Sequence, residues 1–172
     1  KLNDNNFVFS NFTNNLFESK VSFKNTLFFN NNSFDPIKNE VEHNPNVPFF
    51  SLNNFNDDVD FTNCTFIQFT QFISCNFNRK ADFSYSKNLN NGVLLFSECN
   101  FNGVSYFNSS ILNVLTFSKC TFEKITSFNS AQLNKLFLVQ VKFDKTAYFD
   151  YIKITEIENG TFLKSNKVDV WI

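Results

Sequence analysis

The sequence predicts an all-β protein whose chain winds into a parallel β-helix, and three observations lead to that fold class. First, large apolar residues recur at steps of five and six along most of the 172-residue chain. Second, residues 96–116, 117–137 and 138–158 align as three rows of 21 residues with these apolar positions in register. Third, the composition has 27 Phe but only three Gly and three Pro, which a fold with a repeated aromatic slot explains.

A repeat of five or six fits neither a helix face nor a single flat strand. Apolar residues recur about every 3.6 positions on a helix face and about every two positions on a half-buried strand. If each unit forms one side of a coil and four units close it, the apolar residue and the smaller residue two places before it both point to the axis. Successive coils then stack at about 4.8 Å, the strand spacing. Because one unit alone has almost nothing to bury its Phe against, stability is expected to come from stacking.

The first part of the chain contains an early set of repeats and then an interruption. After a polar lead-in over residues 1–6, the period is running at Phe12. Residues 35–49 break the period and contain all three prolines, which cannot donate to a sheet ladder. They are expected to form an irregular loop that projects from the coils. His43, the single histidine, lies in this loop and is interpreted as a solvated side chain.

The second part of the chain carries the regular rows. The coil after Phe83 is longer by three residues, and Asn90-Asn91-Gly92 is expected to hold this surplus as a turn. Residues 157–172 are expected to form a partial last coil in which Val168 restarts the repeat. Residues 1–172 are therefore interpreted as a single β-helix domain of roughly seven coils.

Small-x-Phe triplets carry a family resemblance. These triplets are Cys64-Thr65-Phe66, Cys75-Asn76-Phe77, Ala81-Asp82-Phe83, Cys99-Asn100-Phe101, Cys120-Thr121-Phe122 and Ala147-Tyr148-Phe149. The pattern resembles the pentapeptide-repeat family, and Ala81-Asp82-Phe83 matches the family consensus outright. The units of six resemble the family's looser variant, in which fives and sixes alternate. The resemblance covers nearly the whole chain and implies a right-handed quadrilateral parallel β-helix, but it implies no activity.

The four cysteines are interpreted as structural. Cys75, Cys99 and Cys120 fall at the same inward slot of successive coils, where Val141 follows them, and Cys64 lies on the opposite side. Small buried thiols of this kind are typical of a reducing compartment, so a cytoplasmic location is expected. Parallel side chains give a poor torsion for a disulfide, and a zinc site lacks its CxxC or His partners. No metal and no cofactor are expected.

Several function classes are disfavoured by composition. Sixteen acidic residues against fifteen basic ones leave no basic excess for direct nucleic-acid binding. No apolar run is long enough to span a bilayer, and a single loop His gives no nucleophile, base and orienting group. The chain starts at Lys, lacks Met and stops in the middle of a unit at Trp171-Ile172. It is therefore interpreted as a fragment, or as a solenoid that another segment caps.

Any function is expected on the outward positions, because the inside is nearly uniform. The side centred on Phe61, Phe83, Phe107, Phe128 and Phe149 holds every tyrosine together with acids, and no Lys or Arg stands among its outward slots. The candidate interaction face comprises Asp60, Asp82, Tyr85, Tyr106, Tyr148, Asp150 and Tyr151. Tyrosines with acids on a flat sheet suit protein docking, although tyrosine also favours strands for structural reasons.

Two other sides carry recognisable outward columns. On the side centred on Phe55 and Phe77, stacked Asn side chains are predicted to hydrogen-bond up the columns Asn54, Asn76, Asn100 and Asn56, Asn78, Asn102. On the side centred on Phe50 and Phe72, the outward slots include Phe49, Leu52, Ile73, Leu95, Phe137 and Val139. Contiguous exposed apolar residues mark an interface with a second copy or another segment. Alternatively the register is off by one and these residues point inward; an inward column of Leu94, Leu115 and Leu136 argues for the first register.

Two functions from different classes follow. The first is a non-catalytic protein–protein interaction or scaffold module, part of a larger protein or self-associating, with an unidentified protein partner. The second is implied by the resemblance, since some pentapeptide-repeat proteins are DNA mimics that bind and inhibit DNA gyrase or another type II topoisomerase. In this chain, such mimicry would rest on the face of tyrosines and acids alone.

Overall fold

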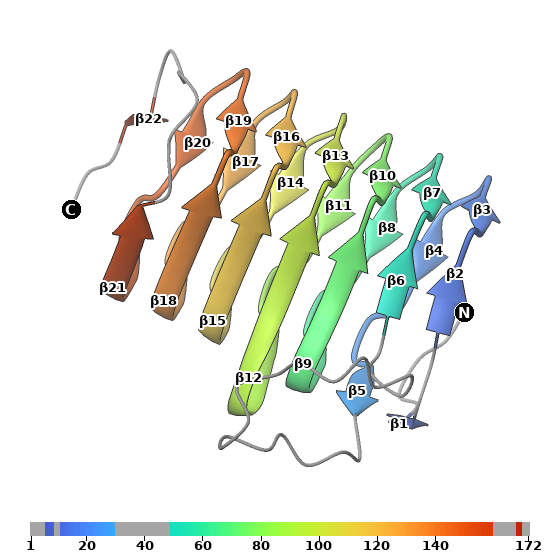
Figure 1. Ribbon diagram of the computed structural model, residues 1–172, viewed down its shortest axis with the longest axis horizontal. Coiled ribbons are helices and arrows are strands. Elements are labelled where there is room, and N and C mark those ends of the chain that lie inside the picture. Colours follow the sequence, from blue (N-terminus) through green and yellow to red (C-terminus); the bar gives the residue numbers. More distant parts are fainter. Residues whose placement is uncertain (1–5, 9–10, 30–48, 160–167, 170–172) are drawn as a thin grey trace.

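The computed structural model describes residues 6–8, 11–29, 49–159 and 168–169. These residues form a parallel β-solenoid of about five turns and contain no helix (Figure 1). Successive turns lie side by side along the long axis, with the N-terminal strands at one end and the C-terminal strands at the other. The roughly seven coils expected from the sequence include residues at both ends of the chain that lie outside the described residues.

Three sheets run along the solenoid, and every strand pair in them is parallel. Sheet A contains β1 (Asn6–Val8), β2 (Asn11–Thr13), β5 (Leu27–Phe29), β6 (Phe49–Ser51), β9 (Thr65–Ile73), β12 (Lys87–Ser97), β15 (Ile111–Ser118), β18 (Gln132–Val139) and β21 (Lys153–Asn159). Sheet B contains β3 (Leu16–Phe17), β7 (Asn54–Phe55), β10 (Asn76–Phe77), β13 (Asn100–Phe101), β16 (Thr121–Phe122) and β19 (Lys142–Phe143). Sheet C contains β4 (Val21–Ser22), β8 (Val59–Asp60), β11 (Ala81–Asp82), β14 (Ser105–Tyr106), β17 (Thr126–Ser127), β20 (Ala147–Tyr148) and β22 (Val168–Asp169).

Files of stacked phenylalanines fill the interior, as the spacing predicts. Phe101 is fully buried, and its ring stacks on Phe77 at 4.7 Å and on Phe122 at 4.5 Å between centroids. Phe122 in turn stacks on Phe143 at 4.9 Å. The other files are named here by one member. The Phe72 file is Phe12, Phe50, Phe72, Phe96, Phe117 and Leu138; the Phe107 file is Phe23, Phe61, Phe83, Phe107, Phe128 and Phe149.

The Phe66 file lines the remaining part of sheet A and contains one polar exception. Its register runs through Phe28, Phe66, Asn88, Leu112, Leu133 and Ile154. Asn88 occupies a Phe slot and is buried, and its Nδ2 donates to the Gly92 carbonyl at 2.9 Å. The expected surplus residues do lie here. They form an irregularity within β12, between Leu89 and Val93, instead of the separate turn that was expected.

The smaller inward residues bond to the backbone of the neighbouring turn. Each cysteine thiol donates to the carbonyl of a phenylalanine in the preceding turn. The pairs are Cys64 to Phe23 at 3.0 Å, Cys75 to Phe50 at 3.3 Å, Cys99 to Phe72 at 3.3 Å and Cys120 to Phe96 at 3.4 Å. Burial raises the pKa of the Cys64 thiol to about 12 and that of Cys99 well above its usual value. These two thiols are therefore protonated at neutral pH, and all four cysteines are free and buried.

Two corners of every turn place a residue in the left-handed conformation, with φ between 51° and 60°. After the Phe72 file these residues are Asn14, Leu52, Ser74, Glu98, Lys119 and Gln140. After the Phe107 file they are Asn25, Asn63, Tyr85, Ser109, Ser130 and Tyr151. Because the conformation recurs at the same place whatever the residue type, the path of the coil imposes it. Asn tolerates this conformation better than most residues with a side chain.

The irregular parts of the sequence lie largely beyond what the structure describes. Of the predicted loop over residues 35–49, only Phe49 is described, as the first residue of β6; His43 lies outside the described residues. Of the predicted partial coil, β21 reaches Asn159 and Val168 pairs in register with Ala147. Val168 therefore pairs two positions before Phe149, whereas the sequence pattern had placed it level with Phe149.

Candidate interaction surfaces

Sheet C aligns part of the predicted interaction face into one outward column. Asp60 pairs with Asp82, and Asp82 pairs with Tyr106 in the next turn. Tyr106 pairs with Ser127, and Ser127 with Tyr148. These residues come from β8, β11, β14, β17 and β20, which follow one another along the solenoid (Figure 1). The sequence spacing therefore places acids at one end of this column and tyrosines at the other.

The remaining members of this face lie beside that column. Tyr85 and Tyr151 occupy the left-handed corner after the Phe107 file, where they are 63% and 87% exposed. Tyr148 is exposed as well, whereas Tyr106 is half-buried. Asp150 precedes the Tyr151 corner, and its backbone N–H donates to Asn129 Oδ1 at 3.0 Å. The two corner tyrosines are thus the most accessible aromatic side chains of the described face.

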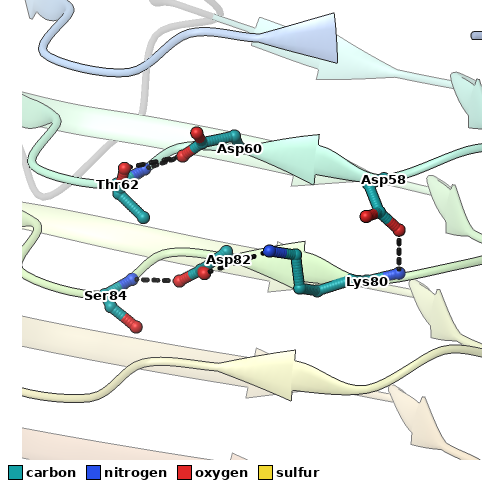
Figure 2. Close-up of polar contacts among 6 residues, drawn as sticks. All are labelled: Asp58, Asp60, Thr62, Lys80, Asp82 and Ser84. Carbon is teal, nitrogen blue, oxygen red and sulfur yellow. Dashed lines mark hydrogen bonds and ion pairs between the residues drawn. The ribbon is translucent and has the colours of Figure 1, made fainter. Parts of the chain in front are cut away.

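The carboxylates of this face are engaged in local contacts, which Figure 2 shows. Asp60 Oδ1 accepts hydrogen bonds from the Thr62 backbone N–H at 2.9 Å and from the Thr62 hydroxyl at 2.7 Å. Asp82 Oδ1 accepts from the Ser84 N–H at 3.1 Å, and Asp82 Oδ2 lies 3.7 Å from Lys80 Nζ. Lys80 was not counted on this face from its slot in the repeat, so the face is less negative than its outward slots alone indicate.

The two acids of the sheet C column have local structural partners. Asp60 and Asp82 stabilise the turns that follow their own strands, as short acidic side chains commonly do. Among the residues that the structure describes, no group of three or more His, Cys, Asp and Glu side chains could hold a metal ion. In that part of the chain there is also no helix of the length and apolarity that crossing a membrane requires.

The predicted apolar side lies on the outer face of sheet A. Leu94, Leu115 and Leu136 are buried with at most 2% exposure, which establishes the register that the sequence argument preferred. Leu95 and Phe137 consequently point outward and are half-buried, as is Ile73. Leu52 is 55% exposed and Val139 is 37% exposed. The side chain of Phe49 lies outside what the structure describes.

Part of this surface was not predicted from the sequence. Phe69, Val93 and Val114 pair in register across β9, β12 and β15 and are partly exposed. Leu89 and Ile111, near the start of β12 and of β15, are 45% and 57% exposed. These residues stand next to the Phe66 file, outside the apolar side that the sequence predicts. Sheet A joins both files in continuous strands, so the apolar surface extends beyond the side first assigned to it.

The outer face of sheet B confirms the predicted asparagine columns. Asn76 Nδ2 donates to Asn54 Oδ1 at 2.6 Å, and Asn100 Nδ2 donates to Asn76 Oδ1 at 2.9 Å. A second ladder runs from Asn102 through Asn78 to Asn56, with both bonds at 2.8 Å. Because these amides satisfy one another along the solenoid, they have a structural use that needs no ligand.

Comparison with known proteins adds no relative to this description. No family model matches the sequence, and neither the curated proteins nor the solved structures include one that is significantly similar.

Proposed function

We propose that this chain is a non-catalytic protein–protein interaction or scaffold module of the pentapeptide-repeat type, part of a larger protein or self-associating. The observation that carries the proposal is the difference between inward and outward positions. Inward residues are buried in stacked files, whereas outward residues differ from sheet to sheet. The outer sheets are therefore the surfaces available for recognition. In this proposal the coil is right-handed and quadrilateral, and four free buried thiols fit a reducing, cytoplasmic setting.

The corner tyrosines of sheet C support a binding role. Tyr85 and Tyr151 adopt the left-handed conformation at a corner that Asn25 and Asn63 occupy in earlier turns. The left-handed conformation costs a residue with a bulky side chain roughly 1 kcal/mol or more of conformational free energy, and it costs Asn less. Both tyrosines are largely exposed, so they gain little by burial. Stability therefore does not account for tyrosine at these two positions, and exposed tyrosines are enriched at protein interfaces.

The test is the variant Tyr85→Asn, which places at the corner the residue type that Asn25 and Asn63 already provide. Proteins retained by the immobilised chain are quantified for wild type and variant, and thermal unfolding is followed by circular dichroism. We expect unfolding at the same or a higher temperature, together with at least about a tenfold loss of a partner that wild type retains. Ser130→Asn, at the same corner, is the matched control and should keep that partner.

Two results would contradict the proposal. One is retention of the same proteins at the same level by wild type, Tyr85→Asn and Ser130→Asn. The other is retention no greater than that by the chemically unfolded chain. Either would mean that this corner of sheet C recognises nothing.

The alternative is a DNA mimic that binds DNA gyrase or another type II topoisomerase. It would rely on the acids of sheet C, but Lys80 lies beside Asp82, and the whole chain carries a net charge of only −1. Mimicry of a duplex depends on a strong negative field, so we place this function second. A supercoiling assay with excess chain separates the two: unchanged supercoiling fits the interaction module, whereas inhibition that Asp82→Asn weakens would favour the mimic.

A further inference from the structure

The outer face of sheet A is formed by long neighbouring strands that contain few charged residues. Its apolar face is defined here as the outward residues Leu52, Phe69, Ile73, Leu89, Val93, Leu95, Ile111, Val114, Phe137 and Val139. Strands β9, β12, β15 and β18 lie side by side as long arrows in Figure 1. Between them these four strands contain only two charged residues, Lys87 and Lys135. A contiguous surface of this kind is unusual for a protein that remains alone in solution.

Two lysines around this face are matched within the chain, whereas Lys87, at the start of β12, makes no ion pair among the described residues. Lys135 Nζ lies 2.8 Å from Glu156 Oε2, on the neighbouring strand β21. At the corner beyond β12 and β15, Lys119 Nζ lies 3.1 Å from Glu98 Oε1. A strongly charged partner would therefore find only one unmatched charge, Lys87, on the four strands. A largely uncharged apolar face is instead best buried against another face of the same kind, and an identical copy of the chain supplies one.

The size of the face also suits a dimer. The strands β9, β12, β15 and β18 have 9, 11, 8 and 8 residues. With a rise of about 3.3 Å per residue and strands about 4.8 Å apart, they cover on the order of 600 Å². Flanking strands β6 and β21 bring the footprint to roughly 700 Å² by the same spacing. A stable interface buries about 800 Å² of accessible surface per partner. Because side chains project from a sheet, the accessible surface of this face is larger than its flat footprint.

Register indicates how two copies would meet. Leu95, Thr116 and Phe137 pair across β12, β15 and β18 and form one outward row. A two-fold axis along β15 would exchange β12 and β18 of the two copies. Leu95 of one copy would then face Phe137 of the other, while Thr116 would face its own equivalent. Large side chains thus meet at the edges of the row, and the smaller threonine lies on the axis.

We propose that the apolar face of sheet A binds a second copy of this chain, with the two Thr116 side chains close to the two-fold axis. The proposal rests on the proposed function in that it identifies one partner of the interaction module. It concerns a different sheet from the corner tyrosines, so the two can fail separately.

The test uses a matched pair of cysteine variants of the 172-residue chain. Thr116→Cys lies on the outer face of sheet A, and Thr121→Cys occupies the equivalent slot on sheet B, in the row Asn100, Thr121 and Lys142. Sheets packed face to face lie about 10 Å apart, too far for a direct disulfide, so a short bifunctional maleimide is used as the cross-linker. We expect a cross-linked dimer for Thr116→Cys and none for Thr121→Cys. Wild type serves as a second control, since its four cysteines are buried. Equal cross-linking of both variants, or none with either, would overturn the proposal.

A second measurement does not depend on cross-linking. Sedimentation velocity of wild type should give the mass of a dimer, and Phe137→Lys should raise the dissociation constant at least about tenfold. Asn100→Lys, on the outer face of sheet B, should leave the dissociation constant unchanged. A wild-type chain that stays monomeric at about 100 µM overturns the second copy as partner. If such a monomer still loses a retained protein on Tyr85→Asn, the interaction module stands without the dimer.

Discussion

Truncation of one central ring, Phe101→Ala, tests whether stacking between turns holds this solenoid together. Phe101 is fully buried and lies between Phe77 and Phe122, with both stacked pairs under 5 Å between centroids. Loss of a buried Phe costs about 3–5 kcal/mol through lost burial and the cavity that remains. Each aromatic pair contributes a further 0.5–1.5 kcal/mol or so. We therefore expect a loss near the top of that range, about 5 kcal/mol.

The same truncation at the end of the file provides the comparison. Phe143 stacks on Phe122 alone among the described residues and is 4% exposed. Phe143→Ala should therefore cost about 1 kcal/mol less than Phe101→Ala, because it loses one stacked pair fewer. Asn102→Ala, on the outer face beside Phe101, is the control for a change that leaves the files intact and should cost about 1 kcal/mol or less.

Urea unfolding followed by far-ultraviolet circular dichroism measures these differences, and native-state hydrogen exchange shows which turns open. A solenoid can unfold in parts, so exchange must accompany the midpoint. Phe101→Ala should reduce protection in the turns on both sides of it. A cost for Phe101→Ala no larger than that for Asn102→Ala would refute the argument that the stacked files are the main source of stability.

Three smaller predictions test polar groups of the fold. Among the described residues, Ser105 Oγ is buried with no hydrogen-bond partner, whereas Ser86 Oγ donates to the Phe61 carbonyl at 2.9 Å. Ser86→Ala should lower the free energy of unfolding by about 1 kcal/mol, and Ser105→Ala should leave it equal or higher. Equal losses would contradict this difference. Asn76→Asp removes the side-chain donor that bonds to Asn54, whereas Asn54→Asp keeps an oxygen that accepts from Asn76. Urea unfolding should therefore show Asn76→Asp to be the more destabilising variant by about 1 kcal/mol. Burial raises the pKa of both Cys64, to about 12, and Cys99 on folding, so their contribution to stability is fully present below pH 9 and is lost as pH rises. Cys64 alone should lower the free energy of unfolding by about 1.4 kcal/mol per pH unit above pH 9. Cys64→Ala should make the slope shallower by about that amount and leave the part due to Cys99, and an unchanged slope in this variant would contradict the role of Cys64.

The candidate surfaces were only partly predictable from sequence. The spacing of Asp60, Asp82, Tyr106 and Tyr148 was sufficient to put them on one side, because each side of a coil repeats at a fixed interval. Their electrostatics were not predictable in the same way. Lys80 reaches Asp82 from a neighbouring slot, and Thr62 and Ser84 bond to the carboxylates two residues before them. Such contacts depend on side-chain direction, which a repeat pattern does not specify.

By itself, the sequence determined which residues face the axis, because a period of five and six leaves a Phe or Leu only one place to be buried. It therefore predicted the file of Phe101, Phe122 and Phe143 and the ladder from Asn54 to Asn100. The tertiary structure decided what happens where the period is broken. Asn88 occupies a position that Phe holds in other turns and donates a hydrogen bond to the Gly92 carbonyl, and Val168 pairs with Ala147. It also joined the Phe66 and Phe72 files into one sheet, whose outer face is wider than either side alone. The physical reason is that inward positions are set by burial within each coil, whereas register, bulges and outer faces depend on backbone pairing between coils.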